Sequence, residues 1–391
     1  MPRTNLILFL PGFTIRKVLN ASPLVIEATY NRKPKCPFCD SSKLRTKGSF
    51  MREVKHESIG LRRAYIRFKA HKFYCYACKR YFNQRFPGIL KHQRATERLK
   101  AQVFEQHTQG VSQLDLAKQL KLGKSTIERW YQQHYLLRAQ SIKAQHWPKV
   151  LGIDEHFFSK KQRFVTTFCD LKNHRIFDIV KGKSGSDLLP FINQLQGRER
   201  VKIACIDLSV TYRNLIKKHF PKALIVTDRF HVLRLIEHAF MKTCHSINPQ
   251  MKYHRGVLAM FRTRPEHLSE TRRLKLKQFL DEQPAIQALY QFKEQLFTLL
   301  KHKHRKAKEC KSLIPIFLDM VKQLKAAVFM PLVKLGKTLF KWREEIVRMW
   351  RFTKNNGITE GFHRKMKLIQ RRAYGFRNFE NYRLRVKVLC S

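Results

Sequence analysis

The stretch between residues 149 and 228 constrains the fold of this 391-residue chain most, because short apolar segments recur there in a specific order. Three strand-like segments come first, separated by turn residues, and two more follow, each preceded by a helical pattern. The five segments are 149–158, 163–171, 174–183, 201–207 and 223–228. Three antiparallel strands followed by α, β, α, β predict a mixed sheet covered by helices.

This order is that of the ribonuclease-H-like fold, in which acids lie at neighbouring strand ends. The ends of the first and fourth strands come close together on such a sheet, and Asp154 and Asp207 occupy those positions. Either acid alone is equally well explained as an ordinary turn residue. Together they predict a site for divalent cations that act on a phosphodiester, and Mg²⁺ or Mn²⁺ suits such hard oxygen ligands.

The charge of the chain points to a polyanionic partner. The chain has 80 Lys and Arg against 28 Asp and Glu, which leaves a formal net charge of +52. Nucleic acid relieves the self-repulsion of such an excess through phosphate contacts, although a ribosome-associated protein or a membrane-surface binder has the same composition. No apolar run reaches the roughly 18 residues of a membrane span and no signal peptide is visible. We therefore expect a cytoplasmic protein with a packed core.

Four of the nine cysteines form two C-x-x-C pairs, Cys36 with Cys39 and Cys75 with Cys78. Two such turns supply the closed tetrahedral sulfur site that structural Zn²⁺ prefers. The alternating segment R-R-A-Y-I-R-F-K-A-H-K-F-Y before Cys75 can form a hairpin, so the pattern predicts a zinc ribbon. Four unrelated thiols are the alternative interpretation.

The segment 112–133 has the pattern of a helix-turn-helix. Ser112 can cap a helix, Gly123 lies in the turn, and Ser125 opens a second helix. The positions expected to face inward are Leu114, Ala117 and Leu120 in the first helix and Ile127 and Trp130 in the second. The second helix of this motif enters the major groove of DNA. The residues expected at its groove-facing end are Lys124, Ser125, Thr126 and Arg129.

The whole order resembles the ISL-three family of bacterial insertion-sequence transposases, which are DDE enzymes. The resemblance rests on the cysteine pairs, the helix-turn-helix, G-I-D-E-H-F, I-D-L-S, P-K-A-L-I-V-T-D-R-F-H-V and N-N-G-I-T-E-G-F-H-R-K-M-K-L-I-Q-R-R-A-Y-G-F-R-N-F. It implies that Asp154, Asp207 and Glu360 form the catalytic, magnesium-binding triad. Where the family pattern usually has Asn after E-G-x, this chain has His363.

The segment D-R-F-H matches a D-x-x-H signature of the family. Asp228 ends a strand one place beyond the strand of Asp207, and the helical insertion separates it from Glu360. We therefore expect Asp228 and His231 to have a supporting role: orienting a ligand or a DNA phosphate, or holding the insertion against the sheet.

The resulting expectation is a multidomain α+β protein. Its parts are a zinc-ribbon domain (1–86), a helix-turn-helix domain (87–145), the first part of a ribonuclease-H-like core (146–231), an all-helical insertion (232–350) and the carboxyl-terminal part of the core with the glutamate (351–391). Amphipathic patterns fill the insertion. The helix after Glu360 carries four cations expected to contact phosphates: Lys365, Lys367, Arg371 and Arg372.

The expected function is that of a DNA transposase that binds the terminal inverted repeats of an insertion sequence and catalyses metal-dependent cleavage and strand transfer. Its partners are double-stranded DNA and, from the resemblance, at least a second copy of itself; its location is cytoplasmic and nucleoid-associated, with no membrane. Two alternatives remain: a transposase-derived transcriptional regulator, and a nuclease of the same fold without strand transfer.

Overall fold

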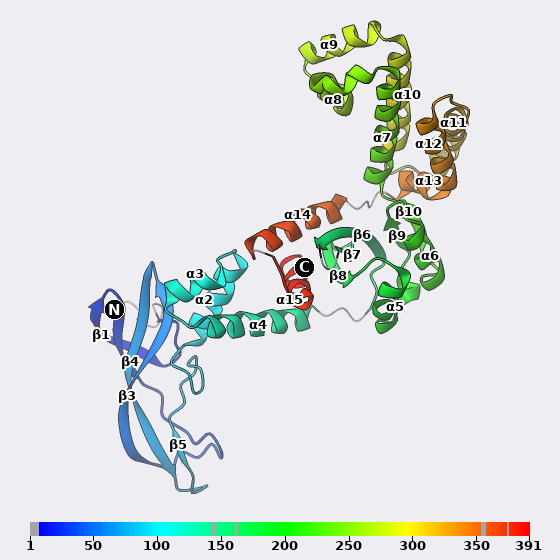
Figure 1. Cartoon of the computed structure of the whole chain (residues 1–391). Helices are drawn as coiled ribbons and strands as arrows, with labels where there is room; N and C mark the ends of the chain where they lie inside the picture. Colours follow the sequence, from blue (N-terminus) through cyan, green and yellow to red (C-terminus); the bar gives the residue numbers. More distant parts are fainter. Residues whose placement is uncertain (1–7, 143–145, 161–162, 353–356, 374) are drawn as a thin grey trace. The chain divides into compact units, whose positions relative to one another are not determined.

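The computed structural model describes residues 8–142, 146–160, 163–352, 357–373 and 375–391, and the side chains of 357–360 lie outside this description. The chain divides into two compact units (Figure 1). The first contains Met1–Ser141 and Ile369–Arg377, and the second contains Ile142–Leu368 and Asn378–Ser391.

A five-stranded sheet forms the first half of the first unit. Its strands are β1 (Phe13–Ala21), β2 (Leu24–Tyr30), β3 (Leu44–Ile59), β4 (Arg62–Cys75) and β5 (Tyr81–Asn83), in the order β1-β2-β4-β3 with β5 beside β4. The long β3–β4 hairpin turns at Gly60, whose φ of +62° suits glycine. Alternate residues of β4, such as Ile66 and Phe68, are buried. The strand expected before Cys75 is thereby confirmed.

Three helices follow in the same unit: α2 (Glu97–Thr108), α3 (Gln113–Leu120) and α4 (Lys124–Ser141). Ser112 caps α3 as expected, because its hydroxyl accepts the backbone N–H of Asp115 at 3.1 Å. Ile127 and Trp130 face the core, also as expected. The expectation for Leu114 is wrong: its side chain is exposed, whereas Leu116 is buried. Leu116 and Leu120, four residues apart, form the inner stripe of α3.

The second unit is built on a sheet whose strand order is β10-β9-β6-β7-β8. Its strands are β6 (Val150–Ser159), β7 (Arg163–Asp170), β8 (Arg175–Lys181), β9 (Ile203–Ile206) and β10 (Leu224–Thr227). The first three are antiparallel neighbours, and β9 and β10 run parallel to β6. All five strands predicted from the sequence are present, with ends shifted by up to two residues.

Helices surround and extend this sheet. They are α5 (Gly185–Gln194), α6 (Val210–His219), α7 (Arg229–Ile247), α8 (Arg255–Arg262), α9 (Glu270–Asp281), α10 (Pro284–Lys301), α11 (Ala307–Lys325), α12 (Met330–Lys341), α13 (Arg343–Arg351), α14 (Gly357–Arg372) and α15 (Phe379–Leu389). The expected insertion, 232–350, contains only helices and the connections between them, and begins within α7 directly after β10. In Figure 1, α7 and α10 lie side by side.

One hydrophobic core joins the sheet to the insertion. It runs from Trp147, beneath the sheet, to Phe317 and Trp350 in α11 and α13, all of which are fully buried. Arg229 at the start of α7 donates to the carbonyls of His302 (2.9 Å) and Met349 (2.7 Å). The insertion is therefore anchored to the end of β10.

Helix α15 closes the free edge of the sheet at β8. Asp178 of β8 accepts from Arg383 (2.6 Å) and Lys387 (2.8 Å), and both cations belong to α15. The backbone N–H of Ile176 donates to the carbonyl of Cys390 at 2.9 Å. These contacts occupy the edge strand, which limits pairing with another chain.

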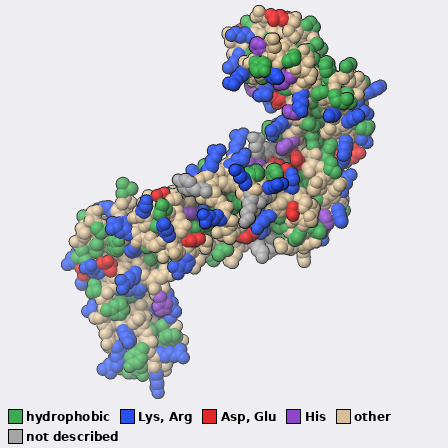
Figure 2. Space-filling view, viewed as in Figure 1, with side chains coloured by type: hydrophobic (Ala, Val, Ile, Leu, Met, Phe, Trp, Pro, Cys, Tyr) green, Lys and Arg blue, Asp and Glu red, His purple; other side chains and the backbone are tan. Residues whose placement is uncertain are grey.

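Basic side chains dominate the surface. Figure 2 shows Lys and Arg spread over the visible face, with far fewer Asp and Glu among them. Within the described residues, the helices include none that combines the length and the low polarity required to cross a bilayer.

Candidate active site

Three aspartates lie at the same level on neighbouring strands of the second sheet. The parallel pairing of β9 with β6 and with β10 ends at Ile153, Ile206 and Thr227. The next residue on each strand is an aspartate, and we call Asp154, Asp207 and Asp228 the acidic row. Adjacent strands are about 4.8 Å apart, so the backbone of Asp207 lies between those of its two neighbours.

Asp154 does not end its strand, although the sequence led us to expect this. Strand β6 continues to Ser159 because β7 pairs with it along its whole length. Strand β9 accompanies only the first four residues of β6, up to Ile153. The acid therefore lies in the middle of β6, at the point where the pairing with β9 stops.

Burial and mutual repulsion act on these carboxyl groups. Burial raises the pKa of Asp154 to about 6, and the charges of Asp207 and Asp228 add to the rise. Burial also raises the pKa of Asp207. The imidazole of His231 opposes both shifts, and the backbone N–H of Glu155 donates to Oδ1 of Asp154 at 2.8 Å.

The acidic row has the properties of a cation site. Among the described residues, Oδ1 of Asp207 is buried and has no hydrogen-bond partner. An unsatisfied buried acceptor is costly, and two adjacent buried carboxylates repel each other. A divalent cation held by Asp154 and Asp207 would satisfy the acceptor and would offset the repulsion. Carboxylate oxygens are the hard ligands that Mg²⁺ prefers.

A histidine from α14 reaches the acidic row. Nδ1 of His363 lies 3.7 Å from Oδ2 of Asp154, and Nε2 lies 3.3 Å from the hydroxyl of Thr167 on β7. The ring also contacts His156, whose Nε2 lies 3.0 Å from the hydroxyl of Tyr382 on α15. Burial lowers the pKa of His156 to about 3, so this second ring is neutral. Helices α14 and α15 thus meet β6 and β7 beside Asp154.

Glu360 lies three residues before His363 in α14, and its side chain is outside the described residues.

Asp228 and His231 lie where β10 passes into α7. Asp228 caps α7, because its Oδ1 accepts the backbone N–H of Phe230 at 3.3 Å. Nε2 of His231 lies 3.6 Å from Oδ2 of Asp228. Asp228 is only 2% exposed. Its carboxylate is thus engaged by its own helix, in contrast to Oδ1 of Asp207.

One acid beside the row was not singled out from the sequence. The carboxylate of Glu155 accepts from the hydroxyl of Tyr212 at 3.4 Å and lies 3.5 Å from Nζ of Lys183. Its charge contributes to the raised pKa of Asp207. The sequence offered one signal for Glu155, its position next to Asp154 in G-I-D-E. Neighbouring residues of a strand point to opposite faces of a sheet, however, so the sequence did not place both acids in one site.

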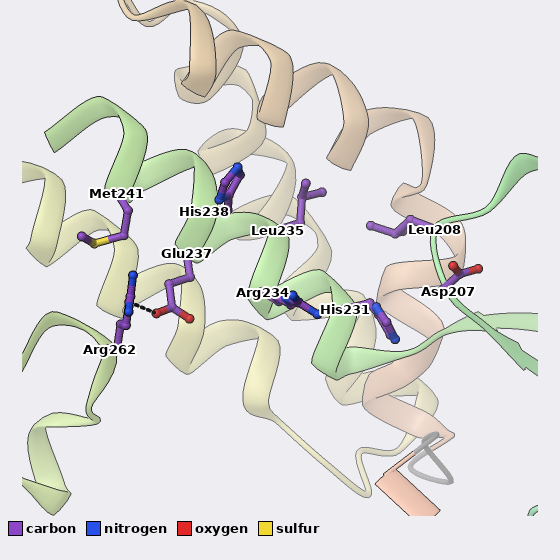
Figure 3. A pocket seen from close by; sticks show the side chains of 9 residues that line it. All are labelled: Asp207, Leu208, His231, Arg234, Leu235, Glu237, His238, Met241 and Arg262. Atoms are coloured by element: carbon purple, nitrogen blue, oxygen red, sulfur yellow. Dashed lines mark ion pairs between the residues drawn. The ribbon is translucent and has the colours of Figure 1, made fainter. Parts of the chain in front are cut away.

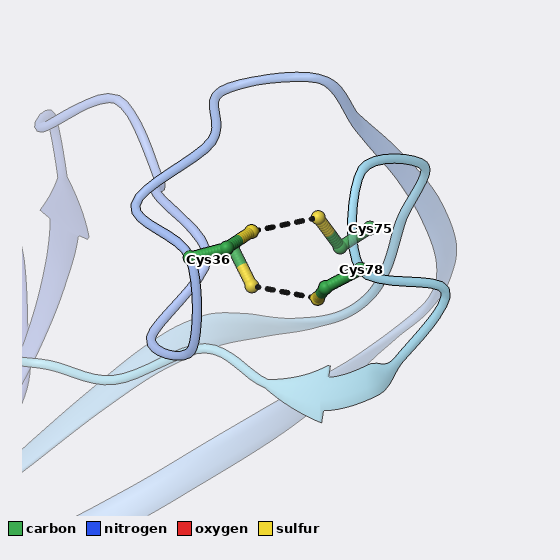
Figure 4. Close-up of side chains that lie close together, drawn as sticks. Cys36, Cys75 and Cys78 are labelled. Carbon is green, nitrogen blue, oxygen red and sulfur yellow. Dashed lines mark hydrogen bonds between the residues drawn. The ribbon is translucent and has the colours of Figure 1, made fainter.

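The four paired cysteines converge in the first unit. Sγ of Cys36 lies 3.5 Å from that of Cys78 (Figure 4), and Sγ of Cys39 lies 3.6 Å from that of Cys75. All four sulfur atoms lie within 4.8 Å of one another, and none forms a disulfide. A disulfide requires about 2.05 Å, whereas sulfurs around one tetrahedral Zn²⁺ at about 2.3 Å are roughly 3.8 Å apart. The cluster therefore has the dimensions of a zinc site.

The first turn of α4 presents the residues expected to face DNA. Lys124, Ser125 and Arg129 are exposed and Thr126 is half-buried. The backbone carbonyl of Lys124 accepts from the side chain of Gln113 at 2.9 Å, which ties the starts of α3 and α4 together. The polar face of α4 is thus opposite Ile127 and Trp130.

The four cations predicted on α14 differ in their surroundings. Lys365 donates to the carbonyl of Leu389, and Arg372 donates to the carbonyl of Gln109 at 3.1 Å. Lys367 and Arg371 are exposed. Two of the four therefore have a structural contact in addition to their charge.

Comparison with known proteins agrees with this architecture. The model of the transposase domain of the ISL3 family matches residues 151–386, more than half of the chain. The helix-turn-helix domain of transposase family ISL3 matches residues 84–135, and the zinc finger of the transposases of IS204, IS1001, IS1096 and IS1165 matches residues 32–78. The chain belongs to the ISL3 family of insertion-sequence transposases.

A curated relative extends this match over most of the chain. The transposase for insertion sequence element IS1001 of Bordetella parapertussis is 24% identical over 366 residues, which cover 90% of this chain and 87% of that protein. The family membership makes this chain a DNA transposase with a zinc ribbon and a DNA-binding helix-turn-helix.

Proposed function

We propose that this transposase cuts DNA at the ends of its insertion sequence and joins the released end to target DNA, using Asp154, Asp207 and Glu360 on a ribonuclease-H-like core. The observation that carries the proposal is the acidic row, in which Oδ1 of Asp207 is buried without a partner among the described residues beside the buried Asp154. The strand order β10-β9-β6-β7-β8 supports the assignment of the core.

Asp154 and Asp207 are the residues that would hold Mg²⁺ or Mn²⁺, with Glu360 as the third ligand. When bound, such ions supply activation of the attacking oxygen and stabilisation of the leaving oxygen. A spacing of three residues places two positions on one face of a helix, so Glu360 shares a face of α14 with His363, which reaches Asp154. The neutral state of His156 beside His363 keeps one positive charge away from the carboxylates.

The reaction consists of two phosphoryl displacements. In the first, a water oxygen bonds to phosphorus and the bond to the 3′ oxygen breaks, which leaves a 3′ hydroxyl and a 5′ phosphate. In the second, that 3′ hydroxyl attacks a target phosphodiester and displaces the target's own 3′ oxygen. The acidic row would hold the ions that orient the reacting phosphate, and such positioning supplies much of the rate gain.

The remaining parts serve recognition. The zinc ribbon and the first turn of α4, with Lys124, Ser125, Thr126 and Arg129, would bind the terminal inverted repeats. Lys365, Lys367, Arg371 and Arg372 on α14 would add phosphate contacts near the site. Asp228 and His231 would support the row by holding α7 at the end of β10. The domains proposed are 1–86, 87–145, 146–231 with 351–391, and 232–350.

Joining two element ends requires at least two copies of the chain, and DNA as substrate places the protein at the nucleoid in the cytoplasm. Both points belong to the proposal.

The decisive experiment incubates the protein with a labelled terminal-repeat duplex and a plasmid target, with Mg²⁺ or with a chelator. We expect metal-dependent nicking at the end and joined products, and we expect Asp207→Ala to lose both while binding the duplex normally. Sequence-specific binding without cleavage would favour a transcriptional regulator. Cleavage without joining would favour a nuclease. Substantial residual cleavage by the Asp207→Ala variant would overturn the assignment of Asp207.

A further inference from the structure

A pocket of about 740 Å³ opens directly beside the acidic row. Asp207 and Leu208 line one end, and most of the wall is one face of α7 (Figure 3). Pockets that hold whole small molecules measure about 300–1,000 Å³, so this space is larger than bound ions need. It can receive part of the substrate that reaches Asp207.

Basic side chains line the wall of this pocket. They are His231, Arg234, His238 and Arg262. The first three repeat at intervals of three and four residues, which places them on one face of α7. At 1.5 Å per residue they extend along about 10.5 Å of the helix. In Figure 3 the side chains of His231 and Arg234 lie on the Asp207 side of the pocket.

A second acid, besides Asp207, lines the pocket, but its charge is offset by a neighbouring cation. Oε1 of Glu237 lies 3.7 Å from Nε of Arg262. The dashed line in Figure 3 marks this pair at the end farthest from Asp207. Arg234 is different: its side chain is exposed, and in the described part of the chain no ion pair or hydrogen bond engages its guanidinium. An unengaged guanidinium next to a phosphodiester site is suited to bind a phosphate in bidentate fashion.

We propose that the pocket binds the DNA backbone that adjoins the reacting phosphate, with Arg234 as its principal phosphate ligand. The proposal rests on the proposed function, because it takes Asp207 as the point where that phosphate reacts. The stretch of α7 from His231 to His238 is about 10.5 Å long, which is the length of helix axis that about three phosphates of one strand occupy in B-DNA. The bound strand belongs either to the DNA flanking the element or to the element end, and both present the same phosphodiesters.

The test measures binding rather than cleavage. The full-length protein is titrated with two terminal-repeat duplexes in the presence of a chelator; one stops at the cleavage point and the other continues into the flank. The logarithm of the binding constant falls linearly with the logarithm of the salt concentration, with a slope of about −0.9 for each phosphate contact in B-DNA. The lost contacts can therefore be counted.

We expect Arg234→Ala to make the slope of binding against salt shallower by about 0.9. Arg234→Lys keeps the charge and should have a slope close to that of the wild type. If only the longer duplex is affected, the strand in the pocket is flanking DNA; if both are affected, it is the element end. Lys275→Ala is the matched control, because Lys275 is an exposed cation on α9 outside the pocket. That variant should keep the wild-type slopes.

The proposal is overturned if Arg234→Ala has the wild-type slope on both duplexes. It is also overturned if Lys275→Ala makes the slope shallower by the same amount as Arg234→Ala. These outcomes are distinct from failure of the proposed function, since a wild-type protein that binds both duplexes without cutting them refutes catalysis alone. Unchanged melting temperatures of the variants confirm that they are folded.

Discussion

Nδ1 of His363 lies 3.7 Å from Oδ2 of Asp154, while the opposite nitrogen of the same ring lies 3.3 Å from the hydroxyl of Thr167. The ring therefore lies against both β6 and β7, and it is placed to influence the orientation of the Asp154 carboxylate. Groups that orient a metal ligand contribute strongly even though they do not touch the metal.

We predict that His363→Ala lowers the cleavage rate and the apparent Mg²⁺ affinity by about 10–100-fold. His363→Asn should retain much more activity, because an amide can donate to the carboxylate from a similar position. The measurement is the cleavage rate as a function of Mg²⁺ concentration for both variants. Equal loss in both, with no change in the Mg²⁺ midpoint, would mean that His363 does not position Asp154.

Asp228 and Asp207 should respond differently to the same substitution. Asp228→Asn keeps a good helix cap on α7, so we expect a stability change of only a few tenths of a kcal/mol and retained Mg²⁺ binding. Asp207→Asn should abolish Mg²⁺ binding, because its Oδ1 is the unsatisfied acceptor of the row. Isothermal titration of Mg²⁺ into each variant distinguishes them. The reverse result would exchange the roles assigned to the two acids.

The stability of the metal-free protein should fall as the pH rises from about 4 to about 6. Burial raises the pKa of Asp154 to about 6 from its ordinary 3.8, so the folded state binds this proton more tightly than the unfolded state. The corresponding loss is about 3 kcal/mol. The other titratable groups that face this carboxyl are Asp207, Asp228, His231 and His363.

The stabilisation of the protein by Mg²⁺ should increase with pH, because the ion binds only the ionised carboxylates. The increase in melting temperature caused by MgCl₂ should therefore be small near about pH 5 and largest above about pH 7. Thermal denaturation at several pH values, with and without the ion, measures it. In Asp207→Asn the increase should disappear; an increase independent of pH would argue against binding at the acidic row.

Replacing Cys36 and Cys39 with serine should remove the zinc. Two of the four sulfur ligands are then lost, and the two that remain cannot complete the tetrahedral site that structural Zn²⁺ prefers. We expect no zinc by elemental analysis and a large loss of binding to the terminal repeat. Cys310→Ser is the control, because Cys310 is not part of the cluster, and this variant should keep its zinc. A full zinc content in the double variant would refute the zinc ribbon.

Arg129→Ala should weaken binding to the terminal repeat more than binding to unrelated DNA. Arg129 is exposed near the start of α4, and a bidentate contact with a base contributes about 1–3 kcal/mol of discrimination. Competition binding with specific and nonspecific duplexes measures the ratio. Lys118→Ala removes an exposed charge from α3 and should reduce both affinities similarly. If the two variants behave alike, Arg129 contacts only phosphates.

The sheet of the second unit was predictable from the sequence because its strands are apolar runs bounded by turn residues. Parallel pairing then brought Asp154 and Asp207 together without any knowledge of side chains. The sequence could not reveal that β6 runs past Asp154, since the length of a strand depends on its partner β7. Leu114 was misassigned for a similar reason, because a short helix with leucines at several positions offers more than one apolar stripe.

The sequence contains a signal for the basic face of α7. Arg234 and His238 recur at helical spacing after the D-R-F-H segment, but in a chain with 80 Lys and Arg such a pattern does not stand out. Only the position of α7 at the end of β10 distinguishes these residues from other surface charges. The contact between His363 and Asp154, separated by 209 positions, likewise depends on tertiary structure.

The pairing of Asp178 with Arg383 and Lys387 also has a consequence for synthesis of the chain. These partners are 205 and 209 residues apart. A ribosome that adds roughly 5–20 residues per second needs about 10–40 s to pass from one to the other. During that interval β8 is an uncovered edge that can pair with a neighbouring nascent chain. Prematurely terminated chains that end between Asp228 and α15 should therefore aggregate, even though they already carry all three acids of the row.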